Sequence, residues 1–429
     1  MCNHVVKTDI LTIIMKYANN KLLMSVSKRV KNIISDEYLL KNSNKKLQIS
    51  DSVKNYDGEY PKELKHLKYG HNFRDYPIVF PEGICVLELG FMFNTNIDNL
   101  PDTIERLKID GMFNKDINKL PKNLKLLHIG NFFNKKISVL PHGLKKLKLG
   151  FNFNSELLNI PSSLETLILE GSFNQELDLS NSKIKYLKIG HMFNKKIDNL
   201  PNTIETLIIG NMFNQEINKL PSLLKTIQFG STFNKKIDCF PSELNKIVFG
   251  YAFDSVIDNI PESVRYMKFG HSFNQKINNF PKNLKTLIFG LKYNIVLDNL
   301  PDNMCYLKIC GEYSYDFMSL PSNITILDID VFNYGYRLFV PTVKVLKLGK
   351  YAYCSLDNLP SIKELIFDEK SYYNNSLDLL PDSMRRIELG YYYNRPITKY
   401  PKSLRSIKIN KNNIDILMNL PKNVVLEYL

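Results

Sequence analysis

The chain has 429 residues, 44% of them hydrophobic and none of them tryptophan, and its formal net charge is +14. A chain of this length exceeds a single compact domain unless it grows by repeating one unit. No apolar run approaches the roughly 20 residues of a membrane-spanning helix, and Lys7, Asp9 and Lys16 make the start a poor signal peptide. Six irregularly spaced cysteines indicate reduced, buried thiols, so we expect a cytoplasmic protein without a membrane anchor.

Residues 8–40 differ from the rest of the chain, because they contain no proline and their apolar residues recur at helical spacing. Asn19-Asn20 divides the segment, which predicts two helices. The run from Leu22 to Asp36, with its Leu-rich stretch followed by Val-Ser-Lys-Arg, resembles the central part of an F-box. Two departures are the missing Leu-Pro at the start and Val30, where an F-box commonly carries an aromatic residue.

The F-box resemblance implies a helical module over residues 1–48 that binds the small adaptor subunit of a cullin–RING ubiquitin ligase. The residues that would make this contact are apolar, namely Ile10, Leu11, Ile14, Leu22, Leu23 and Val26. The alternative is an amphipathic cap that covers the first coil of a repeat array, since an open end exposes core residues and an unpaired strand. The sequence leaves both interpretations open.

The remainder of the chain repeats a unit of 20 residues. One copy reads Leu124-x-x-Leu127-x-Ile129-Gly130-x-x-Phe133-Asn134-x-x-Ile137-x-x-Leu140-Pro141. The 20 prolines follow the same register except Pro77 and Pro396 and a shift of one position at Pro360. So regular a repeat predicts a solenoid in which each coil packs only on its neighbours.

Each recurring position has an expected structural role. Leu127 and Ile129 alternate with other residues, which predicts a short strand with one buried face, and stacked copies would form a parallel sheet. Gly130 would end the strand at a sharp turn, Phe133 would join an aromatic spine, and Asn134 would be a buried amide that bonds loop backbone. The strands should centre on Leu107, Leu127, Leu147, Leu167, Leu187 and Leu207.

The L-x-x-L-x-L pattern is typical of leucine-rich repeats, and the Phe-Asn-x-x-Ile-x-x-Leu-Pro stretch resembles the FNIP repeat of slime moulds and giant DNA viruses. The resemblance covers roughly residues 50–421. It implies a mainly β, leucine-rich-repeat-like solenoid over residues 49–429, with about 18 repeats of parallel coils. If the chain is viral, its location would be the host cytoplasm.

The outward side of the strands is the expected target-binding face. Lysine occupies one outward position in alternate copies and Ile or Val occupies it between them, a pattern that duplication of multi-repeat blocks also explains. The residues that we predict to contact a protein target are Lys146, Lys148, Tyr186, Lys188, Ile208, Tyr266, Lys268, Ile288, Tyr306 and Lys308.

Other classes of function are disfavoured. Residues 1–48 carry nine Lys/Arg and three Asp/Glu, a net +6, which leaves only +8 of the total +14 for the repeats. Because Thr206 and Ile208 interrupt the basic positions, the sequence argues against a nucleic-acid partner. There is no Gly-rich phosphate loop, and no second Cys/His pair accompanies Cys305 and Cys310, so we expect no enzyme, cofactor or metal site.

The sequence thus predicts a non-enzymatic adaptor for protein partners. If both resemblances hold, it would be a substrate receptor of a cullin–RING (SCF-type) ubiquitin ligase. The alternative is a pure protein-binding scaffold whose N-terminal helices only cap the solenoid.

Overall fold

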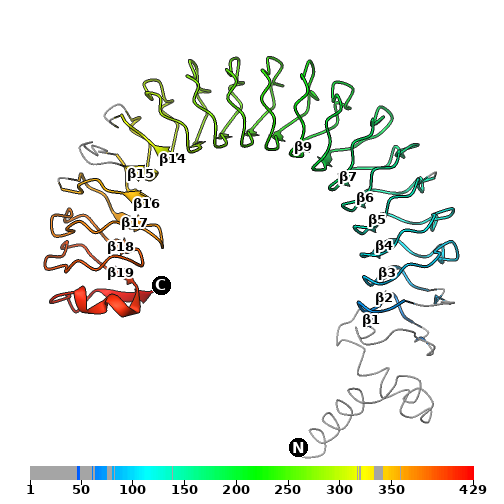
Figure 1. The fold of residues 1–429 in the computed structure, drawn as a ribbon, viewed down its shortest axis with the longest axis horizontal. Helices are drawn as coiled ribbons and strands as arrows, with labels where there is room; N and C mark the ends of the chain where they lie inside the picture. The colour runs from blue at the N-terminus through cyan, green and yellow to red at the C-terminus, as the bar shows by residue number, and fades with distance from the viewer. Residues whose placement is uncertain are drawn as a thin grey trace, which may run out of the picture. The chain divides into compact units, whose positions relative to one another are not determined.

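The computed structural model describes residues 46–48, 60, 63–74, 80–81, 83–137, 139–315, 317, 320–332, 342–357 and 359–429. Each described coil carries one strand, and within each of the two units described below the strands of successive coils pair in parallel (Figure 1). The chain divides into two compact units, Met1–Met192 and Phe193–Leu429. The expected helices of residues 8–40, with all six residues predicted to bind a ligase subunit, lie outside the described residues.

Unit one contains the first strands of the array. They are β1 (Lys46–Gln48), β2 (His66–Lys68), β3 (Val86–Leu89), β4 (Arg106–Ile109), β5 (Leu126–Ile129), β6 (Lys146–Leu149), β7 (Thr166–Leu169) and β8 (Tyr186–Ile189). Pairing joins residues 20 positions apart, as in Leu127 with Leu147. β1 pairs with β2, so paired strand begins within the last residues of the expected N-terminal module.

Unit two continues the parallel pairing, but some of its partners are 19 or 22 residues apart, as in Leu327 with Leu346 and Leu365 with Ile387. Its strands are β9 (Thr206–Ile209), β10 (Thr226–Gln228), β11 (Lys246–Val248), β12 (Tyr266–Lys268), β13 (Thr286–Phe289), β14 (Tyr306–Glu312), β15 (Ile326–Phe332), β16 (Val345–Ala352), β17 (Glu364–Phe367), β18 (Arg386–Glu388), β19 (Ser406–Ile409) and β20 (Val425–Tyr428). All six predicted strand centres lie within strands, which confirms the parallel solenoid.

A short 3₁₀ helix, η1 (Lys411–Ile416), was not expected within the repeats. It replaces the turn after β19, in a coil where Asn413 stands at the position of the spine phenylalanine. The side chain of Asn410 accepts a hydrogen bond of 3.0 Å from the backbone N–H of Asn412 and so caps the helix. Without the aromatic anchor, this local hydrogen bonding determines the backbone conformation.

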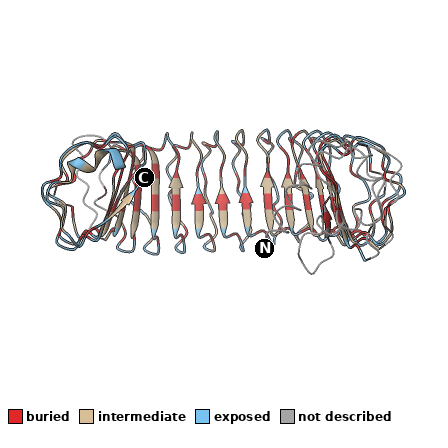
Figure 2. Cartoon of the chain, turned by 90° about the horizontal axis from the view of Figure 1, so that it is seen from below, coloured by how far each residue is buried: buried red, intermediate tan, exposed pale blue. Residues whose placement is uncertain are grey.

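The core of each coil is formed by the inward residues of its strand and by the recurring aromatic residue. Leu127 and Ile129 are fully buried, and Figure 2 shows the buried positions aligned from strand to strand. Phe133 stacks on Phe113 at 5.8 Å and on Phe153 at 5.9 Å between ring centroids. The aromatic spine is therefore confirmed, and its stacked contacts recur from coil to coil between Phe73 and Phe173 and between Phe193 and Tyr293.

Unit two has a second aromatic row that the sequence analysis did not identify. Its members occupy the last inward position of four successive strand segments, and they are Phe229, Phe249, Phe269 and Phe289. Phe249 stacks on Phe269 at 5.3 Å along the row and on spine residue Phe253 at 3.9 Å within its own coil. The available signal was Phe where other copies carry Ile or Leu.

Glycine follows the strand one position later in some copies, and the structure shows why for Gly111 and Gly171. Their φ angles are +48° and +55°, a region in which a Cβ atom is strained. A Cβ atom on Gly111 would also lie 2.2 Å from the ring of Phe91 in the preceding coil. Asp110 and Glu170 occupy the usual glycine position there, so the following residue must make the turn.

The asparagine of the Phe-Asn pair forms a ladder, but it is not the buried amide that we expected. Asn114 and Asn134 are exposed. The backbone N–H of Asn134 donates to Oδ1 of Asn114 at 2.9 Å, and the N–H of Asn154 donates to Oδ1 of Asn134 at 2.9 Å. The predicted bonding to loop backbone is confirmed, whereas burial is wrong because the side chain lies on the outer surface of the turn.

The ladder predicts a difference between two substitutions of Asn134. Asn134→Ala removes the acceptor for the N–H of Asn154 and should lower the free energy of unfolding by about 1 kcal/mol. Asn134→Asp keeps an acceptor and should have a smaller effect, since Asp254 accepts from the N–H of Asn274 at 2.8 Å in the same position. Urea unfolding midpoints measure both, and equal midpoints would contradict the ladder.

Tyrosine at the spine position gives a second prediction. Tyr373 is 2% exposed, and its hydroxyl has no hydrogen-bond partner within the part of the chain that the structure describes. Tyr373→Phe should therefore raise the free energy of unfolding by about 1 kcal/mol, because a buried unsatisfied hydroxyl is removed. In the control Tyr393→Phe, a 3.2 Å hydrogen bond to the carbonyl of Asn375 is lost, and stability should fall. Thermal denaturation that moved both variants in one direction would refute this account.

Candidate interaction faces

The outward strand residues form one solvent-facing surface in each unit. They alternate with the buried residues, so the strand positions that carry Lys148 and Lys268 face away from the core. The strands of unit one hold Lys146, Lys148, Tyr186 and Lys188. Those of unit two hold Ile208, Tyr266, Lys268, Ile288, Tyr306 and Lys308. The predicted target-binding residues thus belong to two faces, one in each unit.

Two of the predicted lysines in unit one have no ion pair within the described part of the chain. Lys148 Nζ lies 3.1 Å from Glu170 Oε1 of the next coil. Lys146 is exposed and Lys188 is half-buried, and neither has an ion-pair partner among the described residues. Side chains of this kind can form charge-assisted hydrogen bonds with a partner without first breaking internal ones.

The middle of unit two presents a mixed surface. Lys268 is exposed without an ion-pair partner in the described ranges, and Ile288 follows it on the next strand. The ammonium group of Lys246 lies 4.7 Å from the ring centroid of Tyr266, within the range of a cation–π contact. Burial raises the pKa of the Tyr266 hydroxyl, so this residue presents an uncharged phenol. A partner here would meet two cations, Lys246 and Lys268, among aromatic and aliphatic groups.

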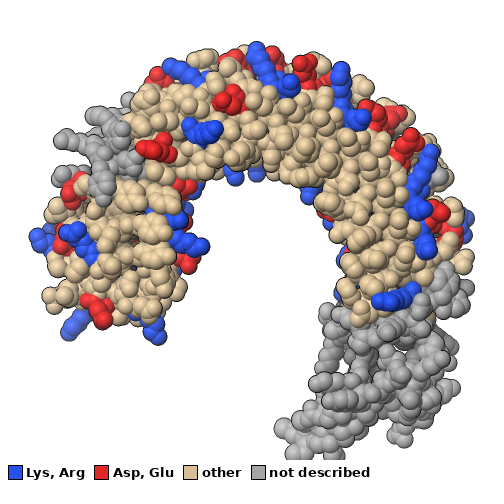
Figure 3. Space-filling model, in the orientation of Figure 1, with Lys and Arg blue, Asp and Glu red and all other residues tan. Residues whose placement is uncertain are grey.

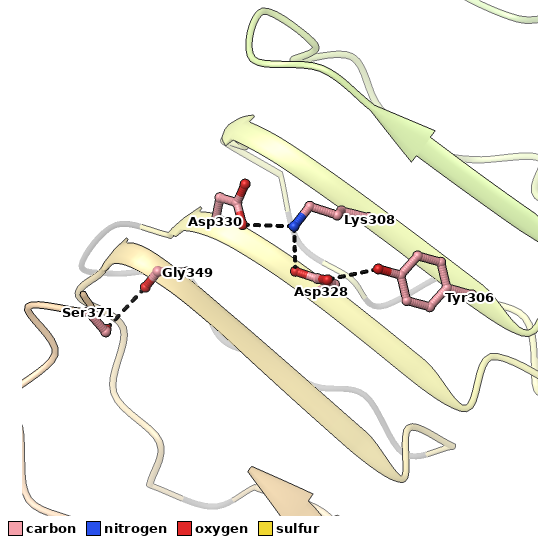
Figure 4. Close-up of polar contacts among 6 residues, drawn as sticks. All are labelled: Tyr306, Lys308, Asp328, Asp330, Gly349 and Ser371. Carbon is pink, nitrogen blue, oxygen red and sulfur yellow. Dashed lines mark hydrogen bonds and ion pairs between the residues drawn. The ribbon is translucent and has the colours of Figure 1, made fainter. Parts of the chain in front are cut away.

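Tyr306 and Lys308 are engaged in an internal polar cluster, which the sequence analysis missed (Figure 4). The hydroxyl of Tyr306 donates to Asp328 Oδ2 at 2.8 Å. Lys308 Nζ lies 3.2 Å from Asp328 Oδ1 and 3.1 Å from Asp330 Oδ1. Because Asp328 is only 8% exposed, these groups stabilise one another first.

The electrostatics of this cluster agree with its geometry. Burial and then the Asp328 hydrogen bond raise the pKa of Tyr306. Burial lowers the pKa of Lys308, but the charges of Asp328 and Asp330 outweigh it and hold that pKa above its ordinary value. Both groups therefore keep their protons at neutral pH. The only signal in the sequence was an aspartate where neighbouring copies carry Lys or Ile.

Unit one also contains a groove that the sequence did not indicate. It has a volume of about 470 Å³ and its lining includes Lys68, Phe91, His128 and Lys148. Burial, reinforced by the charge of Lys148, lowers the pKa of His128, so its imidazole is neutral at pH 7. Asp110 and Glu170 also line it, so the groove combines charges of both signs with an aromatic wall.

Two of the histidines pack against aromatic rings. The ring of His271 stacks on Tyr251 at 4.5 Å, and the ring of His71 stacks on Phe91 at 4.9 Å.

The cysteines in the described ranges are all free. Cys354 is buried but Cys305 is exposed, so the prediction that all the thiols are buried is wrong. No grouping of three or more His, Cys, Asp or Glu suited to a metal ion occurs in the residues that were described. No helix there is long and apolar enough to cross a membrane.

Comparison with known sequences supports the repeat assignment for part of the chain. The family described as FNIP Repeat matches residues 113–152, 173–212, 213–252, 233–272 and 253–292. These segments carry FNIP repeats, as their Phe-Asn and Leu-Pro spacing indicated. No curated protein sequence matches the chain.

Two solved structures resemble the fold. CroV588, described as a novel circular LRR protein, is 22% identical, with a TM-score of 0.59 over 89% of this chain and 80% of that one. YopM from Yersinia enterocolitica WA-314 is 16% identical, with a TM-score of 0.53 over 99% of this chain and 95% of that one. At these identities the likeness shows the fold alone, and that fold is leucine-rich-repeat-like.

The polar cluster predicts unequal roles for two lysines at equivalent strand positions. Lys308→Met leaves Asp328 without its cation and should lower the free energy of unfolding by about 1–3 kcal/mol. The matched control Lys268→Met removes no ion pair and should change it by less than about 0.5 kcal/mol. Urea unfolding measures both values. A Lys308→Met protein as stable as the control would contradict a structural role for the cluster.

Proposed function

We propose that this protein is a non-enzymatic adaptor that holds protein partners on the outward faces of its strands. The observation that carries the proposal is the solvent-facing strand surface of each unit, on which Lys146 and Lys188 of unit one and Lys268 of unit two have no ion-pair partner among described residues. The buried residues between them fix their backbone positions, so little conformational entropy is lost on binding. The leucine-rich-repeat-like fold is consistent with a protein-interaction scaffold.

The finer proposal is that the protein is a substrate receptor of a cullin–RING ubiquitin ligase. It is supported by the F-box resemblance of the run from Leu22 to Asp36. In this arrangement, residues 1–48 bind the small adaptor subunit and the coils of residues 49–429 present the target. The alternative remains a pure scaffold in which the N-terminal segment only caps the solenoid.

Co-purification of the full chain with a purified ligase adaptor subunit separates the two proposals. The wild type should bind, and Leu23→Glu with Val26→Glu should abolish binding, because apolar contacts would carry the affinity. The control Asn42→Glu with Asn44→Glu adds the same charge outside the proposed contact and should bind normally.

A melting curve of the same proteins completes the test. A receptor requires coils that stay folded in the Leu23→Glu, Val26→Glu protein, since each coil is stabilised mainly by its neighbours. A cap requires the reverse, with no adaptor bound by the wild type and a lower melting temperature in the double variant. Absence of wild-type binding would refute the ligase proposal.

A further inference from the structure

The outward face of unit one carries charge with a period of two coils. Its even-numbered strands, β2, β4, β6 and β8, hold all the lysines and arginines of the described strands β2–β8, namely Lys68, Arg106, Lys108, Lys146, Lys148 and Lys188. The strands between them present Val86, Leu126 and Ile168 together with Glu88 and His128. Cationic and largely apolar strands therefore alternate along this face.

Acidic residues form ion pairs with some of these lysines. Asp110 lies 2.9 Å from Lys108 and Glu170 lies 3.1 Å from Lys148, while Glu88 accepts from His66 at 2.7 Å. The cations left without an ion pair in the described part of the chain are Lys68, Arg106, Lys146 and Lys188. There is one on each even-numbered strand, so along the stack they are about 10 Å apart, twice the spacing of paired strands. Across the strands they are staggered, because Arg106 and Lys146 stand two residues before the position of Lys68 and Lys188.

Several cations on the later strands of unit two form ion pairs, although Lys347 on β16 has none among the described residues. Lys308 contacts Asp328 and Asp330, as described above. Arg386 lies 2.7 Å from Glu388 and 3.4 Å from Glu427, and Lys408 lies 3.8 Å from Glu388. The coils can therefore supply a carboxylate to a lysine or arginine on this face. In unit one, by contrast, one cation on each even-numbered strand from β2 to β8 has no carboxylate partner among the described residues.

The groove in unit one adds an apolar contact beside these cations. Its lining includes Lys68 and the aromatic ring of Phe91. Phe91 is held between His71, stacked at 4.9 Å, and Phe132, which meets it edge-on at 6.3 Å. A large apolar side chain of a partner can be desolvated against this wall while a neighbouring carboxylate reaches Lys68.

We propose that the outward face of β2–β8 binds an acidic polypeptide segment that lies extended across the strands. An extended chain advances about 3.3 Å per residue, so a carboxylate at every third residue matches the spacing of these cations along the stack. The long, flexible lysine and arginine side chains cover their offset across the strands. Its carboxylates pair with Lys68, Arg106, Lys146 and Lys188, and an apolar residue enters the groove. This inference rests on the proposed protein-binding function and specifies the partner's chemistry.

A nucleic acid fits this face less well than an acidic polypeptide. Duplex DNA carries one negative charge per about 1.7 Å of its axis, so phosphates would also lie opposite Glu88, Asp110 and Glu170. A polypeptide can place neutral residues at those positions. The face favours charges that are spaced apart over a continuous row of phosphates.

Fluorescence anisotropy with the full chain tests the proposal. The probe is a labelled peptide with Glu at every third position, Ser and Gly between, and one central Leu, and its counterpart has Gln for Glu. The Glu peptide should bind and the Gln peptide should not. Arg106→Gln with Lys146→Gln should weaken binding about tenfold, since two exposed ion pairs are lost. Lys115→Gln with Lys183→Gln makes the same change in net charge on exposed loop residues and should leave binding unchanged.

Three results would overturn the proposal. They are equal binding of the Gln peptide, equal weakening by both double substitutions, and stronger competition by an oligothymidine than by unlabelled Glu peptide. Failure of this proposal differs from failure of the adaptor function. If Arg106→Gln with Lys146→Gln removes a co-purifying protein although the Glu peptide does not bind, the acidic partner is wrong and protein binding by the face remains.

Discussion

The stacking of each coil on the next at an interval of 20 residues is the constraint on which the structure depends. A strand of three or four residues has no partner within its own coil, so its backbone bonds to neighbours, as when the N–H of Lys145 donates to the carbonyl of Lys125 at 2.9 Å. The same interval brings Phe133 onto Phe153 and Asn154 onto Asn134. Backbone, spine and turn therefore share one register, and a partner on the outward face meets side chains at that spacing.

This constraint explains which features could be predicted from the sequence. Leu127 and Ile129 recur at a fixed interval. In a solenoid, residues that recur at the repeat interval lie next to the equivalent residues of the neighbouring coils. Strand positions and the aromatic spine follow directly from that rule. The exposure of Asn134 does not, because the repeat shows that the side chain bonds a neighbour but not whether protein or solvent lies beyond it.

Departures from the repeat were beyond sequence reasoning because each depends on a contact between two different coils. Lys308 and Lys268 occupy equivalent positions in the repeat, but Asp328 on the next strand makes Lys308 part of a buried cluster. The turn at η1 likewise forms where Asn413 replaces an aromatic residue, and the side-chain amide of Asn413 donates to the carbonyl of Tyr393 in the preceding coil at 2.9 Å. In the space-filling view, Lys and Arg lie beside Asp and Glu over the coil surfaces (Figure 3), so a count of charges does not reveal which cations are paired.

Block duplication alone accounts for lysines in alternate coils, but it does not account for Asp110 and Glu170. Each of these acids displaces the glycine that ends a strand, and each requires the next residue to be a glycine with positive φ. The acid and the shifted glycine are therefore coupled changes, whereas a surface lysine can change alone. Their effect is to neutralise Lys108 and Lys148 while Arg106 and Lys146 on the same strands stay unpaired. The acidic residues at the turns of unit one thus determine which outward cations stay unpaired. The numbers of charged residues in the sequence alone would not reveal this.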